Sequence, residues 1–166
     1  MSGAAAGKPS MARHTAARLA AVQALYQIEV TSAAPGNVVE EFSAHRLGKS
    51  QDGEAPTKAS AALFGEIVRG TSARRQEIDA MINAALGPDR AADRLELIVA
   101  SILRAGAYEL LARKDAPVRA VISEYMNLAH GFFAGNEPKL VNGVLDRIAR
   151  TLRPGELGNE RGQAAG

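Results

Sequence analysis

The stretch that decides the fold is DAPVRAVISEYMNLAHGF, residues 115–132, and the NEPKLVNGVLDRIARTL of residues 136–152 that follows it. In both segments apolar side chains recur every three or four positions, which is the period of an α-helix with one buried face. Pro117 and Pro138 stand where each helix begins, where a missing N–H costs nothing. Gly131 and Gly135 bracket the end of the first segment. The expected core positions are Val118, Val121, Ile122, Tyr125, Leu128, Ala129, Phe132, Val141, Val144, Leu145, Ile148 and Leu152.

The same period extends toward the N-terminus. It predicts a helix from about Ser10 to Val30, and a shorter one over residues 37–47. The expected inward positions are Leu19, Val22, Tyr26 and Val30 in the first and Val38, Val39 and Phe42 in the second. Residues 48–56 are predicted to form an exposed loop, after which Thr57 is a helix N-cap.

Three further helices are predicted between Thr57 and Arg113. The first carries Leu63, Phe64, Ile67 and Val68, and we expect a break and a new cap at residues 70–72. The next carries Ile78, Ile82 and Leu86 and stops at residues 87–88. The third, over residues 94–113, is apolar nearly all round, which is typical of a central buried helix.

These segments give about seven helices and no convincing strand, so the predicted fold class is a compact all-α bundle. Of the 166 residues 46% are hydrophobic but only 4% aromatic, so Ala, Leu, Val and Ile must form the core. We expect one helical domain over residues 11–153. Residues 1–10 and 154–166 lack periodicity and are expected to be flexible tails.

The composition argues against several protein classes. The sequence has no Cys, no apolar run near the ~20 residues that a membrane span needs, and no signal-peptide pattern. We therefore expect a cytoplasmic protein without disulfides or membrane contact.

No catalytic motif is evident. His14, His45 and His130 are far apart and none belongs to a metal-binding pair at helical spacing. The triplet Gly48-Lys49-Ser50 lacks the first glycine of a phosphate-binding loop. The sequence predicts no enzyme, no metal and no cofactor.

The net charge is +2, and basic residues concentrate at the two ends of the domain. His14 and Arg18 are one helical turn apart, while Lys139, Asp146, Arg150 and Arg153 share a stripe opposite the core face of the last helix. Cations on a rigid helix can bind a phosphate backbone. A merely solvated surface explains the charges equally well, and the pattern does not separate RNA from DNA.

Three segments, taken together and in this order, resemble the NusB family. They are RLAAVQALY at residues 18–26, ILRAGAYEL at residues 102–110, and the PVRAVISE of residues 117–124 with the KLVNGVLDR of residues 139–147. The resemblance covers roughly residues 11–153 and implies a fold of two small helical bundles.

The resemblance also implies a function in transcription antitermination and termination. The chain would bind single-stranded boxA-like RNA of ribosomal RNA operons together with the small-subunit ribosomal protein NusE. With other Nus factors, this complex would modify the RNA polymerase elongation complex.

Carried over to this sequence, the resemblance implies two sets of site residues. The RNA-binding set is Arg13, His14, Arg18, Arg104, Asn136 and Lys139. The partner-binding set is Tyr26 and Glu109. Alternatives stay open residue by residue: Tyr26 can belong to the core, Arg104 can be structural, and Asn142-Gly143 can simply let two helices approach closely. The opening helix has fewer consecutive arginines than the family pattern, which implies weaker or more partner-dependent RNA binding.

Two other readings of the whole chain remain. One is a helical protein-interaction module that binds no nucleic acid. The other is an RNA-binding domain akin to that of a ribosomal RNA methyltransferase, which needs a following catalytic domain that we do not expect here because the sequence ends at Gly166.

Overall fold

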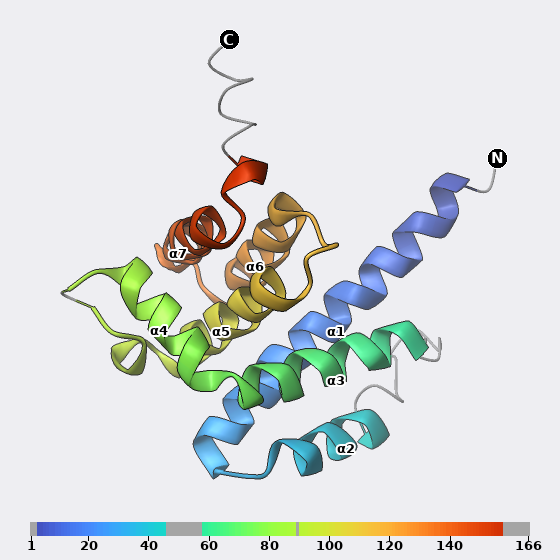
Figure 1. Ribbon diagram of the computed structural model, residues 1–166. Coiled ribbons are helices and arrows are strands. Elements are labelled where there is room, and N and C mark those ends of the chain that lie inside the picture. Colours follow the sequence, from blue (N-terminus) through green and yellow to red (C-terminus); the bar gives the residue numbers. More distant parts are fainter. Residues whose placement is uncertain (1–2, 46–57, 89, 158–166) are drawn as a thin grey trace. The chain divides into compact units, whose positions relative to one another are not determined.

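The computed structural model describes residues 3–45, 58–88 and 90–157, and within these ranges it contains only helices (Figure 1). Side chains are described from His14 and, in the second range, from Ser60. The α-helices are α1 (Gly3–Thr31), α2 (Pro35–His45), α3 (Lys58–Ala73), α4 (Arg75–Leu86), α5 (Leu97–Ala112), α6 (Val118–Phe132) and α7 (Glu137–Leu152), with a 3-10 helix, η1 (Ala92–Arg94), before α5. The prediction of an all-α fold is confirmed.

The chain divides into two units, residues 1–73 and residues 74–166. We call them unit 1 and unit 2. Unit 1 holds α1–α3, and unit 2 holds α4, η1 and α5–α7. Two units agree with the two small bundles that the family resemblance implies.

In unit 1, α1 packs against α3, and α2 contacts both. The Phe42 and Phe64 rings stack with their centroids 5.8 Å apart and join α2 to α3. The predicted loop at residues 48–56 and the predicted cap Thr57 lie outside the described residues.

The buried face of α1 consists mainly of alanines, and here the predicted stripe is wrong. Val22 is fully buried, but Leu19 is half-buried, and Tyr26 and Val30 are 41% and 56% exposed. The side chains that are buried instead are Ala17, Ala20, Ala21, Ala24 and Leu25. Small side chains allow a close approach of neighbouring elements, and they carry too little hydrophobicity to mark a face in the sequence. The helix also begins at Gly3, so the predicted tail at residues 1–10 is helical from that residue on.

The boundary between α3 and α4 lies later than predicted. The expected break at residues 70–72 does not occur, because α3 continues to Ala73 and the chain turns at Arg74. Thr71 is 1% exposed and belongs to the buried face of α3 rather than to a cap. The predicted stop at Gly87 is confirmed: its φ of 88° is a conformation that favours glycine.

In unit 2, α5 packs against α4, α6 and α7. Every residue from Val99 to Leu110 is buried, which confirms the predicted central helix. It begins at Leu97 rather than Arg94, because residues 92–94 form η1. The Asn83 side chain accepts a 2.7 Å hydrogen bond from the Ala92 N–H and ties η1 to α4.

Both α6 and α7 begin next to the prolines, where the sequence predicts their starts. Pro117 is the N-cap of α6, and Pro138 lies in the first turn of α7 behind the N-cap Asn136. Their predicted core positions are buried except Phe132, which is exposed, and Leu152, which is half-buried.

The chain after α7 also packs on unit 2. Residues 154–157 form a further helical turn in which Leu157 is 6% exposed. Glu156 accepts a 3.3 Å hydrogen bond from the Val118 N–H, at the start of α6. The predicted C-terminal tail is therefore ordered to residue 157 in the part of the chain that is described.

Candidate nucleic-acid interface

In unit 1, the predicted RNA-binding residues lie along the first half of α1. Arg13 is on this helix, but its side chain lies outside the described ones. His14 is half-buried and Arg18 is only 9% exposed. Because residues four apart share a helix face, His14 and Arg18 lie one above the other. The limited exposure of Arg18 leaves His14 as the more accessible of the two side chains.

In unit 2, Asn136 and Lys139 lie together at the start of α7, and both are exposed. Asn136 is the N-cap but makes no side-chain hydrogen bond to the helix, so its amide remains available to a ligand. Lys139 makes no hydrogen bond or ion pair with any residue that the structure describes. The N-terminal end of a helix also carries partial positive charge. This corner of unit 2 can therefore bind a phosphate group.

An aromatic pair stands just before this corner, and sequence reasoning missed it. Phe132 was predicted to be in the core, yet it is 40% exposed and lies 6.3 Å, centroid to centroid, from the ring of Phe133. Exposed aromatic rings are typical of surfaces on which unpaired bases stack. Its place in the sequence could have predicted this exposure. Phe132 is the last residue of α6, where helical spacing no longer determines which side chains are buried.

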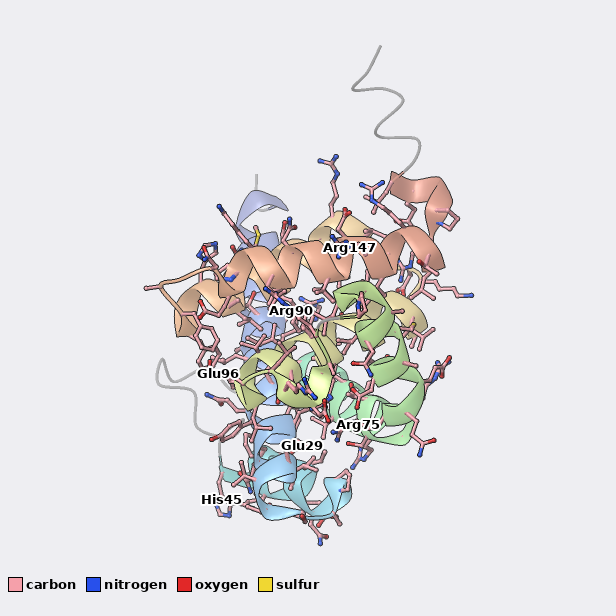
Figure 2. The ribbon with its side chains drawn as sticks, turned by 90° about the vertical axis from the view of Figure 1, so that its left-hand side faces the viewer. Glu29, His45, Arg75, Arg90, Glu96 and Arg147 are labelled. Atoms are coloured by element: carbon pink, nitrogen blue, oxygen red, sulfur yellow. The ribbon has the colours of Figure 1, made fainter. Side chains whose placement is uncertain are left out.

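The other cations of α7 are bound within unit 2, which corrects the predicted basic stripe. Arg147, which Figure 2 labels, donates a 2.7 Å hydrogen bond to the Ala85 carbonyl in the last turn of α4. Arg150 pairs with Asp146 at 2.7 Å, and the hydrogen bond that it donates to this carboxylate raises the pKa of Arg150. Arg153 is 8% exposed and donates to backbone carbonyls. Three of the four cations of α7 and its end therefore have partners within unit 2. The fourth, Lys139, is available to an outside ligand.

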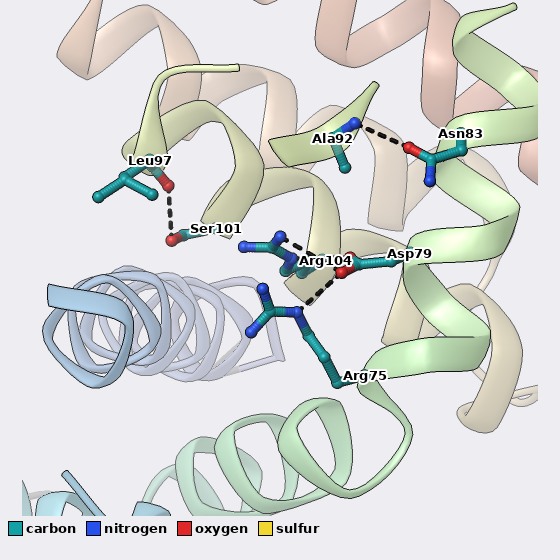
Figure 3. Close-up of polar contacts among 7 residues, drawn as sticks. All are labelled: Arg75, Asp79, Asn83, Ala92, Leu97, Ser101 and Arg104. Carbon is teal, nitrogen blue, oxygen red and sulfur yellow. Dashed lines mark hydrogen bonds and ion pairs between the residues drawn. The ribbon is translucent and has the colours of Figure 1, made fainter. Parts of the chain in front are cut away.

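Arg104 is held inside unit 2 by Asp79. It is 4% exposed, and its Nε lies 2.8 Å from Asp79 Oδ1, while Arg75 binds the other oxygen of the same carboxylate at 2.8 Å (Figure 3). Of the two readings left open for Arg104, this geometry supports the structural one. Contact with RNA stays a prediction for this residue.

Asp79 lies between opposing effects on its acidity. Burial raises its pKa, but the hydrogen bonds and charges of Arg104 and Arg75 outweigh burial and hold the pKa below its ordinary value. A lowered pKa in the folded state means that the ionised carboxylate stabilises the fold.

We expect Asp79→Asn to destabilise the protein at neutral pH more than at acid pH. The contribution of Asp79 is fully present above the ordinary carboxyl pKa of about 3.9, and it is lost as the pH falls through the lower pKa of the folded state. Urea unfolding of the native protein and the variant between pH 7 and pH 3 measures this difference. A difference between the two proteins that stays constant over this range would contradict the assignment.

The predicted partner-binding residues differ in accessibility. Tyr26 is 41% exposed and lies one turn before the exposed Val30, so it is a surface residue and not part of the core. Glu109 is fully buried, and its carboxylate accepts hydrogen bonds from the Tyr125 hydroxyl and from Arg113. It joins α5 to α6, so direct partner contact stays a prediction without an exposed surface to support it.

The described residues contain neither a metal-type cluster nor a membrane-type helix. No three His, Cys, Asp or Glu side chains gather there as a metal would require. None of the helices in these ranges has the length and apolar content needed to cross a membrane.

Comparison with known proteins identifies the family. The model of the NusB family matches residues 15–150. The chain belongs to the NusB family. It is 51% identical over 138 residues to the transcription antitermination protein NusB of Sinorhizobium fredii (strain NBRC 101917 / NGR234), an alignment covering 83% of this chain and 86% of that protein. NusB of Rhizobium rhizogenes (strain K84 / ATCC BAA-868) is 50% identical over the same coverage.

Solved structures of the family share the fold. T. maritima NusB superposes with a TM-score of 0.71 at 29% identity, over 82% of this chain and 90% of that one. A crystal structure of the antitermination factors NusB and NusE in complex with dsRNA gives a TM-score of 0.72 at 23% identity, over 85% of this chain and 98% of that one. Since its relatives are named transcription antitermination proteins, the family confirms the prediction of a transcription factor rather than an enzyme.

Proposed function

We propose that this protein binds single-stranded boxA-like RNA of ribosomal RNA operons together with NusE, and that the complex acts with other Nus factors on RNA polymerase in the cytoplasm. The main support for RNA binding is the set of accessible side chains at the start of α7. There Lys139 and Asn136 are exposed beside the helix N-terminus, and Phe132 presents an aromatic ring nearby along the chain.

Each element of this corner supplies a different part of RNA recognition. Lys139 and the helix N-terminus attract phosphate and contribute salt-dependent affinity. The Phe132 ring offers a stacking surface to an unpaired base, and the Asn136 amide can donate to or accept from a base edge. This combination favours single strands, because the bases of a duplex are already stacked.

The exposed apolar residues of α1 support NusE as the protein partner. Tyr26 and Val30 are a large aromatic and a β-branched side chain, one turn apart and open to solvent. Tyr is enriched at protein interfaces because its ring is apolar and its hydroxyl can hydrogen-bond. We propose this face of α1 as a contact for NusE.

We expect Lys139→Ala and Phe132→Ala to weaken RNA binding in different ways. Loss of Lys139 removes one phosphate contact, so the salt dependence of log Kd falls by about one unit of slope. Loss of Phe132 removes a stacking contact, which costs about 1–3 kcal/mol at every salt concentration. Fluorescence anisotropy with a boxA-like strand and a scrambled strand, with NusE present, measures both effects across a salt series.

Arg90→Ala is the matched control, because Arg90 is also exposed in unit 2 and its side chain makes no hydrogen bond or ion pair with described residues. It should leave both the affinity and the slope unchanged. Equal binding of the boxA-like and scrambled strands in the presence of NusE would overturn the proposed function and leave a helical protein-interaction module.

A further inference from the structure

A pocket of about 570 Å³ in unit 2 lies apart from the start of α7. Its apolar lining comes from the end of α5 and the end of α7, chiefly Leu111 and Leu152, which are both half-buried. Leu152 is thirteen residues beyond Lys139, which corresponds to about 20 Å along a helix at 1.5 Å per residue. A ligand in this pocket can therefore bind while RNA occupies the other end of α7.

The pocket is rich in positive charge. Arg74, Lys114 and Arg153 line it, against the single carboxylate of Glu156. Two of these four groups are already used in the fold. Arg153 donates to backbone carbonyls at the end of α5, and Glu156 accepts from Val118 and lies 3.6 Å from Arg153.

The two remaining cations are available to a ligand. Lys114 is exposed and has no hydrogen bond or ion pair with any described residue. Arg74 pairs with Glu77, but the two side chains are 41% and 51% exposed, and a pair of this kind contributes little stability and exchanges easily. The partial negative charge at the end of α5 is also offset by the Arg153 guanidinium, so it does not repel an acid.

We propose that this pocket docks an acidic segment of a partner protein. An aliphatic side chain of the segment contacts Leu111 and Leu152, and its carboxylates pair with Lys114 and Arg74. A protein segment is favoured over nucleic acid, because the lining residues include leucines but no aromatic ring on which a base could stack. Apolar anchors flanked by complementary charges are the usual composition of a peptide-binding groove.

The test uses the full chain, labelled with ¹⁵N, and a synthetic twelve-residue peptide of alternating leucine and glutamate pairs. Amide shifts should appear at residues 111–114, 152–153 and 155–156 and should be absent with a matched peptide that has glutamine for glutamate. Lys114→Glu should raise the Kd of the glutamate peptide by about tenfold or more, because it replaces an attraction by a repulsion. Arg90→Glu changes the net charge equally, outside the pocket, and should leave the affinity within about twofold.

Several results would overturn the proposal. They are equal binding of the glutamine peptide, shifts confined to other helices, or no effect of Lys114→Glu. A twelve-nucleotide RNA that produces the same shifts at lower concentration would make this a phosphate-binding surface instead. If Lys114→Glu lowers the thermal midpoint of unfolding, the test uses Lys114→Gln instead. That variant should still bind the glutamate peptide more weakly than the native protein does.

Discussion

Replacing Arg153 by Met is expected to destabilise unit 2 by about 3 kcal/mol or more, because the arginine caps the end of a buried helix. The last carbonyls of a helix have no partner within that helix. Arg153 is 8% exposed and satisfies four of the carbonyls in and after the end of α5. Its acceptors are Glu109 at 3.3 Å, Leu110 at 3.0 Å, Arg113 at 2.7 Å and Ala116 at 2.6 Å.

Met keeps an unbranched apolar stem but donates nothing, so the Leu110 and Ala116 carbonyls lose the partner that Arg153 supplies. The Glu109 and Arg113 carbonyls keep their backbone donors, the N–H groups of Arg113 and Ala116. Urea unfolding followed by circular dichroism measures the loss. Arg153→Lys should fall between the native protein and Arg153→Met, because an ammonium cannot reproduce the fork of five N–H donors. Arg150→Met, one turn earlier, removes only a half-exposed pair with Asp146 and should change stability little. Equal losses for Arg153→Met and Arg150→Met would show that the carbonyl contacts contribute nothing.

The sequence predicts the helices of unit 2 well because their cores use large apolar side chains. In α6 and α7 the residues from Val118 to Ala129 and from Val141 to Ile148 repeat at helical spacing, and the predicted inward positions are buried there. In α5 the apolar character covers all sides, and all sides are buried. When only one face of a helix carries large apolar side chains, that face is the one that is buried, so the prediction from periodicity is correct.

Prediction from sequence fails where a face is built from small residues or where a helix ends. The buried face of α1 is alanine-rich, so the larger Tyr26 and Val30 were wrongly assigned to the core. Phe132 and Arg153 lie at or just past helix ends, where helical spacing no longer determines direction. Phe132 points to solvent and Arg153 turns inward.

The sequence suggests which residues belong to the candidate site but not how accessible they are. Asn136 and Lys139 at the start of α7 were expected on the RNA side, and both are exposed. The burial of Arg18, Arg104 and Glu109 could not be read from the sequence, because charged residues are normally at the surface. Arg104 pairs with Asp79 and Glu109 with Tyr125, and both partners are distant in sequence, so no local pattern signals these contacts.

Replacing Gly106 by Val is expected to destabilise unit 2 by about 2–3 kcal/mol, because α5 and α7 approach closely at this residue. A Cβ at Gly106 would lie 2.8 Å from Leu145 Cδ1 and 3.3 Å from Tyr125 Cδ2, and both neighbours are fully buried. The sequence left open that Asn142-Gly143 lets two helices approach closely, but a Cβ at Gly143 meets nothing within 4 Å. Gly143→Ala should therefore stabilise the protein by about 0.5–1 kcal/mol through helix propensity alone.

A double-mutant cycle separates the steric cause from a general intolerance to change at Gly106. Leu145→Ala alone should cost about 2–5 kcal/mol, because it leaves a cavity. In the double variant the valine methyl groups enter that cavity, so the total loss should be smaller than the sum of the two single losses by about 1 kcal/mol or more. Urea unfolding of the four proteins gives the coupling. Strict additivity would mean that the Leu145 methyl groups do not limit the space at Gly106, and the limit would then come from Tyr125 on α6 instead.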